Sequence, residues 1–177
     1  LRGWSELDEL VAAKASERKD GDRAVARVLI GMVLPGDHTT LMHQITQPLN
    51  QEDSGEGARA RATRIRQDLV AHLAKQLSRG IPTAAQRRTL HSLRDLLKDR
   101  HVELRVYTRQ PLHGKTYILH REDPSTPRHA FVGSSNFTRA GLTSNLELNV
   151  DVSDADSTAK LEQWFTDLWE DKWTLPI

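Results

Sequence analysis

The feature of the sequence that most constrains its fold is a change of hydrophobic period near residue 100. Before this point, residues 64–79 and 83–99 carry isoleucine and leucine at spacings of three and four, which predicts two amphipathic helices. After it, apolar and polar residues alternate in short segments, which predicts strands. These segments are 102–108, 115–119, 130–133 and 146–152. A chain that contains both periods is expected to pack helices against a β-sheet.

The two ends of the chain complete this expectation. Residues 4–18 and 156–173 again show helical spacing, and the apolar run at residues 24–34 predicts a buried strand. Residues 50–62 are polar and contain glycine, so we expect a loop there. The sequence therefore predicts a single α/β domain over residues 1–177, with helices flanking both faces of a mixed β-sheet. Because the chain begins with Leu rather than Met, we expect this domain to be a part of a longer protein.

Composition narrows the class of protein and of chemistry. The chain has no cysteine, so it has no disulfide, no thiolate zinc site and no cysteine nucleophile, which fits a cytoplasmic protein. Its apolar runs are far shorter than the roughly 20 residues of a membrane-spanning helix, so we expect no membrane partner. The histidines show no metal-ligand spacing, and neither a metal nor another cofactor is expected.

Positive charge is concentrated in the middle of the chain. The net charge is only +1, but arginines recur between residues 59 and 109, whereas the tail after Glu147 is acidic. This distribution favours a polyanionic partner such as nucleic acid. The alternative is that the arginines only cover the solvent-exposed faces of two helices.

Two candidate catalytic side chains lie two residues apart in the segment HGKTYIL. Residues i and i+2 of a strand point to the same side, so His113 and Lys115 are expected to project together. Gly114 between them leaves room for a close approach from the other side. An imidazole can attack phosphorus as a nucleophile, and an ammonium can stabilise charge on the phosphate oxygens. The pair therefore indicates phosphate chemistry.

A polar turn and a carboxylate complete the candidate site. The strand that follows ends in Gly133, Ser134, Ser135 and Asn136. Backbone N–H groups, hydroxyls and an amide in such a turn form a cradle that suits a phosphate, so we expect these residues to bind substrate. Asn136 is also expected to stabilise charge together with Lys115. Glu147 lies on a core strand, where a carboxylate needs a partner, and it is expected to hold the imidazole of His113 in one tautomer.

The order of these residues resembles the HKD motif of the phospholipase D superfamily. His113-x-Lys115, then GSSNFT, then Glu147 after a short spacer, is similar to the branch of single-motif nucleases. The stretch VGSSNFTRAGLTSNLELNV is similar to the phospholipase D-like domains of superfamily 2 (Swi/Snf-like) helicases. The resemblance implies that His113 is the nucleophile and Lys115 the phosphate binder, with Ser134 and Asn136 lining the pocket and Glu147 supporting the histidine. The family motif usually ends in an aspartate, and this sequence has His120 at that position.

The resemblance also implies an activity and partners. It implies a metal-independent phosphodiesterase that cleaves nucleic acid, DNA rather than RNA, through a phosphohistidine. It also implies that the domain is part of a helicase or of a restriction or repair protein. The sequence contains one His-x-Lys pair, and the leaving oxygen needs a second proton donor, so we expect a homodimer in which two His113 side chains face one phosphate. The alternative is a nucleic-acid-binding module with little or no activity, which His120 favours. A phospholipase is disfavoured because no interfacial apolar helix is predicted.

Overall fold

The structure, a computed structural model, describes residues 4, 7–17, 24–31, 56–79, 83–110, 112–136 and 146–177. Its helices are α1 (Asp8–Ser16), α3 (Glu56–Arg79), α4 (Ala84–Lys98) and α6 (Ala155–Glu170). Its strands are β1 (Ala26–Ile30), β2 (Val102–Tyr107), β3 (Thr116–His120), β4 (Arg128–Gly133), β5 (Asn149–Val152) and β6 (Thr174–Pro176). The predicted α/β class is confirmed. The described strands form two sheets of three strands rather than one sheet, and the flanking of both faces by helices stays a prediction.

The first sheet, sheet A, has the order β1-β2-β6 and is the mixed one. Strand β1 runs parallel to β2, with Ala26 opposite Val102, and β6 runs antiparallel to β2, with Thr174 opposite Tyr107. Val102 and Val106 of the central strand lie on the same face and are fully buried, so this face of β2 packs into the core.

The second sheet, sheet B, has the order β3-β4-β5 and is antiparallel throughout. Thr116 lies opposite Val132, and Val132 lies opposite Val150. Directly opposite residues share a face, and successive residues alternate between faces. The register therefore decides which side chains of the three strands can act together.

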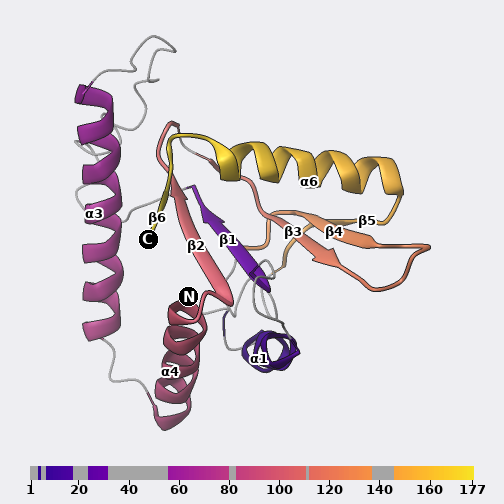
Figure 1. Cartoon of the computed structure of the whole chain (residues 1–177), viewed down its shortest axis with the longest axis horizontal. Coiled ribbons are helices and arrows are strands. Elements are labelled where there is room, and N and C mark those ends of the chain that lie inside the picture. The colour runs from indigo at the N-terminus through magenta and orange to yellow at the C-terminus, as the bar shows by residue number, and fades with distance from the viewer. Residues whose placement is uncertain are drawn as a thin grey trace.

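Helix α6 connects the two sheets (Figure 1). Toward sheet A, the guanidinium groups of Arg27 and Arg105 lie 5.6 and 4.3 Å from the ring centre of the buried Trp169, which stacks on Phe165. Cations over an aromatic face are attracted to the negative charge of the ring. Arg105 also donates a hydrogen bond of 2.9 Å to the Trp169 carbonyl, which satisfies an unpaired acceptor at the end of the helix.

Toward sheet B, α6 is held by an ion pair and a cap. The Arg128 guanidinium lies 2.6 Å from a carboxylate oxygen of Glu162, and both side chains are largely buried. The Asp154 carboxylate caps the helix by accepting a hydrogen bond of 2.8 Å from the Ser157 N–H. This bond lowers the pKa of Asp154, as expected for a carboxylate at a helix N-terminus. The helix is therefore fixed on both sheets.

Helix α3 begins earlier than the sequence predicts. The prediction of a loop at residues 50–62 is wrong from Glu56 onward, because α3 begins at Glu56. Residues 50–55 lie outside the described part of the chain. Ala58 and Ala62 are buried against Trp173. They continue the apolar stripe of Ile65 and Leu69 at helical spacing. A stripe made of alanine among arginines lacks the large side chains by which an amphipathic helix is recognised.

The end of the chain also differs from the prediction. The helix expected to reach residue 173 ends at Glu170, because the Asp171 carboxylate accepts a hydrogen bond from the Trp173 N–H and turns the chain. The strand β6 that follows was not predicted. It is too short for a periodic pattern, and it forms only by pairing with β2.

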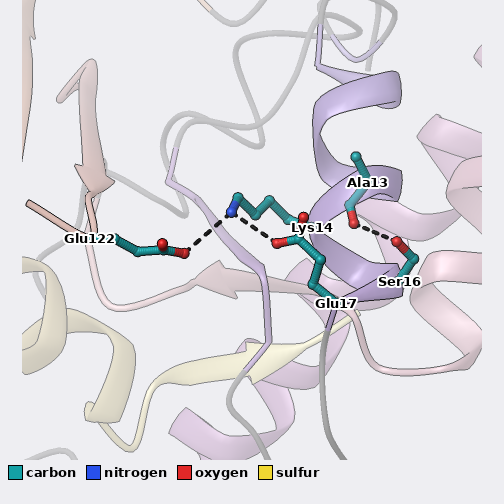
Figure 2. Close-up of polar contacts among 5 residues, drawn as sticks. All are labelled: Ala13, Lys14, Ser16, Glu17 and Glu122. Carbon is teal, nitrogen blue, oxygen red and sulfur yellow. Dashed lines mark hydrogen bonds and ion pairs between the residues drawn. The ribbon is translucent and has the colours of Figure 1, made fainter.

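Helix α1 contacts the loop between β3 and β4 (Figure 2). The Lys14 ammonium lies 2.9 Å from a carboxylate oxygen of Glu17 and 3.4 Å from one of Glu122 in that loop. These contacts raise the pKa of Lys14, with Glu17 as the larger cause. Because the ammonium is exposed to solvent, the pair contributes little to the stability of the fold. It links the N-terminal helix to the hairpin that follows the candidate catalytic pair.

Candidate active site

The candidate catalytic pair lies in the extended segment that leads into β3. The Leu112 N–H donates to the Gly31 carbonyl at 3.1 Å, which anchors the segment to the end of β1. The Gly133 N–H donates to the Lys115 carbonyl at 3.1 Å, which continues the pairing of β3 and β4 by one residue. His113 is therefore held between two backbone anchors.

The glycine between the pair shows which way its neighbours point. A Cβ added to Gly114 would lie 3.1 Å from the Trp164 ring, so Gly114 faces α6. By alternation, His113 and Lys115 point to the opposite side of sheet B, which we call the front face. His113 is exposed and Lys115 is partly buried. Their joint action at one site stays a prediction.

Ser134 joins the turn to the segment that carries Glu147. Its hydroxyl donates to the Glu147 carboxylate at 2.5 Å and accepts a hydrogen bond of 3.0 Å from the Leu148 N–H. Its own N–H donates to the Leu148 carbonyl at 3.0 Å. The strand predicted from residue 146 begins only at Asn149, because this side chain replaces a backbone acceptor of the ladder. The two predicted site residues Ser134 and Glu147 are therefore in direct contact.

The other two polar residues of the turn differ in exposure. Ser135 is only 3% exposed, and its hydroxyl accepts a hydrogen bond of 2.7 Å from the Asn149 side-chain amide. Asn136 is exposed, as a group that meets substrate must be. The expected contact of Ser135 with substrate stays a prediction.

Gly133 is where strands β4 and β5 approach most closely at the site. It lies opposite Asn149 in the register and is bonded to Lys115 on its other side. A Cβ at this position would overlap with the Leu148 carbonyl oxygen and with the Asn149 side chain. Only glycine lets β5 come this near, and this approach carries Glu147 to Ser134.

Two residues of the front face were missed as site candidates. Tyr117 follows Lys115 by two residues, and its hydroxyl donates to the Ser135 carbonyl at 2.9 Å. Burial, and then the charge of Glu147, raise the pKa of Tyr117. Asn149 follows Glu147 by two residues and bonds Ser135, as described above. Extending the i, i+2 pattern by one step on each strand identifies both.

Hydrogen bonds connect part of the predicted constellation. A backbone hydrogen bond joins Gly133 to Lys115, and a side-chain hydrogen bond joins Ser134 to Glu147. His113 and Asn136 each lie two residues along the chain from Lys115 and Ser134, respectively, and their convergence on one phosphate stays a prediction. The expected support of His113 by Glu147 stays a prediction, since the carboxylate contact that the structure shows is with Ser134.

His120, at the position of the usual motif aspartate, lies away from this constellation. It ends β3, and its imidazole lies 3.6 Å from the Glu162 carboxylate of α6. Five residues of extended chain separate it from Lys115, roughly 17 Å at a strand's rise per residue. Its odd number of steps from Lys115 also places it on the other face.

Comparison with known proteins decides the family. The family model described as "Cardiolipin synthase, PLD-like domain" matches residues 66–169, which is more than half of the chain and includes every candidate site residue. The chain belongs to the phospholipase D superfamily. Neither a curated protein nor a solved structure gave a match.

Membership of the phospholipase D superfamily indicates an activity in general terms. A phospholipase D-like domain implies a hydrolase of the phosphodiesterase type. Among the helices that the structure describes, none combines the length and the apolar character needed to cross a membrane.

A Gly133→Ala substitution tests the close approach of β4 and β5. The added methyl would push β5 away, so we expect the free energy of unfolding to fall by roughly 1–3 kcal/mol and the phosphodiesterase activity to be lost. Gly57→Ala in α3 is the matched control, because a Cβ there meets nothing within 4 Å. It should raise stability by roughly 0.5 kcal/mol. Thermal unfolding and diester hydrolysis measure both. A Gly133→Ala protein with normal stability and activity would contradict the packing described here.

Proposed function

We propose that the protein is a metal-independent phosphodiesterase that cleaves nucleic acid through a covalent intermediate on His113. The observation that carries this proposal is the continuous arrangement on the front face of sheet B. There Lys115 is bonded to Gly133, and the adjoining Ser134 is bonded to Glu147. An ammonium, a hydroxyl and an exposed amide at Asn136 can surround the oxygens of one phosphate, with the exposed His113 imidazole at the edge.

The chemistry follows from the properties of these groups. An imidazole nitrogen of His113 forms a bond to phosphorus, and the bond from phosphorus to the leaving oxygen breaks. The leaving oxygen takes a proton from a second imidazolium. Water then donates one of its own protons to the second imidazole and attacks phosphorus, which breaks the bond to His113. Lys115 and Asn136 stabilise the charge that builds up on the non-bridging oxygens in both steps.

Exposed arginines support a nucleic acid as the substrate. They lie on α3 and α4 at Arg59, Arg64, Arg87, Arg88 and Arg94. Helix α3 lies at the opposite end of the molecule from sheet B in Figure 1. A substrate that touches both α3 and His113 is therefore a polymer, and side chains of this type bind its phosphates without reading sequence. The attachment of this domain to a helicase is part of the same proposal.

Not every arginine in the basic middle of the chain is available for this purpose. Arg105 lies under α6 on the Trp169 ring, and Arg109 lies 3.5 Å from the Asp171 carboxylate. These two stabilise the fold and are not available to bind a phosphate backbone.

The placement of His120 favours an active enzyme over an inert binding module. The feature that favours the module is the absence of the motif aspartate, which is replaced by His120. Because His120 contacts Glu162 on the face of α6, its identity affects the packing of that helix rather than the front face.

We further propose that a second copy of the chain supplies the second imidazole. The site is incomplete without a second proton donor, and the sequence has one His-x-Lys pair. Beside the site, Leu146, Leu148 and Val150 are more than half exposed, and β5 is the edge of sheet B among the described strands. An open groove of about 590 Å³ between β5 and α6 adjoins Val150. By alternation these side chains point to the α6 side of sheet B, and apolar surface at the edge of a sheet fits a contact between copies along that edge.

The proposed activity is tested by hydrolysis of a small chromogenic phosphodiester and of DNA in EDTA. We expect both to be cleaved, and His113→Ala to lower the rate at least about 10³-fold, because the nucleophile is gone. His91→Ala, which removes an exposed histidine on α4, should leave the rate unchanged. Cleavage that needs magnesium and survives His113→Ala would overturn the proposal.

Further arms of the same assay identify the substrate. Preferential cleavage of phospholipid vesicles would replace nucleic acid by a lipid. Steeply salt-dependent DNA binding without any cleavage would select the binding module.

The shared site is tested with Leu148→Lys, which places a charge in the proposed contact. We expect light scattering to show a shift from dimer to monomer, with a fall in diester hydrolysis of about tenfold or more. Leu10→Lys on α1 is the control, since Leu10 is also an exposed leucine. It should change neither property. A wild-type protein that is strictly monomeric and fully active would exclude a shared site.

A further inference from the structure

Ser135, in the middle of the turn, is bonded through each of its polar groups. Its hydroxyl accepts a hydrogen bond from the Asn149 amide at 2.7 Å, and its N–H donates to the Asn149 side-chain oxygen at 3.5 Å. Its carbonyl accepts the hydroxyl of Tyr117 at 2.9 Å. A buried serine with these partners has little freedom to move, and it is flanked on both sides by residues of the site.

The two partners of Ser135 come from the strands that carry the charged site residues. Tyr117 lies on β3, two residues after Lys115, and Asn149 begins β5, two residues after Glu147. All four therefore share the front face. Ser135 is the point at which the strand of the lysine, the strand of the glutamate and the turn of Ser134 and Asn136 are joined.

We propose that Tyr117 is a positioning residue of the active site. Its hydroxyl fixes the turn through the Ser135 carbonyl, so that Ser134 and Asn136 meet the same phosphate as Lys115. This inference rests on the proposed function. It assigns Tyr117 a role that requires no contact with the substrate or with a reacting atom. It also explains why this position has a tyrosine rather than a phenylalanine.

The surroundings of Tyr117 keep its hydroxyl a donor. Burial and the charge of Glu147 raise its pKa, so the phenol stays protonated at neutral pH and above. Among the described residues, His113, Lys115, His129 and Asp151 are other charged or titratable groups on this face, and the His129 imidazole lies 2.8 Å from the Asp151 carboxylate. Because the folded-state pKa is raised, the bond is fully present below the ordinary pKa of tyrosine and is lost as the pH rises through the folded-state value.

Tyr117→Phe tests this role because it removes only the hydroxyl. We expect kcat/KM for the small diester to fall about three- to tenfold, as for the loss of one net hydrogen bond, with a smaller relative change in the thermal midpoint. Tyr107→Phe is the matched control, since Tyr107 is the other of the two tyrosines, is buried where Tyr117 is partly buried, and lies in sheet A. It should leave kcat/KM unchanged. Wild-type kcat/KM in Tyr117→Phe overturns the proposal.

A second readout separates this inference from the proposed function. Calorimetry with inorganic phosphate reports the anion cradle even if no hydrolysis occurs. Weaker binding in Tyr117→Phe than in Tyr107→Phe supports the positioning role, and equal binding overturns it. In the Tyr107→Phe protein, ultraviolet titration follows Tyr117 alone. Adding Glu147→Gln to this protein should lower the pKa of Tyr117, because a charge that disfavours the phenolate is removed. An unchanged pKa would contradict the placement of Tyr117 and Glu147 on the same face.

Discussion

The site depends on the close approach of two strands at Gly133. Without a side chain at this position, β5 comes near enough for its first residues to bond the turn that ends β4. The same glycine is bonded to Lys115 on its other side, so one residue sets the spacing of all three strands of sheet B. The contact of Ser134 with Glu147 and the burial of Ser135 follow from that spacing. The arrangement of the turn that we propose to hold a phosphate is thus a consequence of strand register.

Helix α6 complements this register by covering the back of the sheet. Its Trp164 faces Gly114, its Glu162 binds Arg128, and its Trp169 lies between two arginines of sheet A. The helix therefore fixes sheet B on sheet A. It packs on the back of sheet B and not on the front face, which carries the polar residues. His120 belongs to the covered side, which is why a change in the last residue of the motif is compatible with an intact front face.

Local patterns in the sequence predict much of this arrangement and miss the parts that need long-range contacts. Alternation identified β2, β3 and β4, and the His113–Lys115 pair with its turn indicated the face that is proposed to carry the site. The division into two sheets and the strand β6 depend on pairing between distant segments, which alternation does not encode. The first turns of α3 were missed because alanines form their buried stripe. Tyr117 resembles an ordinary strand residue until its hydroxyl is seen on the Ser135 carbonyl.

The central claim is that phosphorus is attacked by the protein before it is attacked by water. The stereochemical course of hydrolysis at a phosphorus made chiral by sulfur and heavy oxygen tests this claim most directly, because each displacement inverts the configuration. Attack by His113 followed by attack by water predicts overall retention. Overall inversion would show that water attacks the diester in one step, and it would contradict the covalent role of His113.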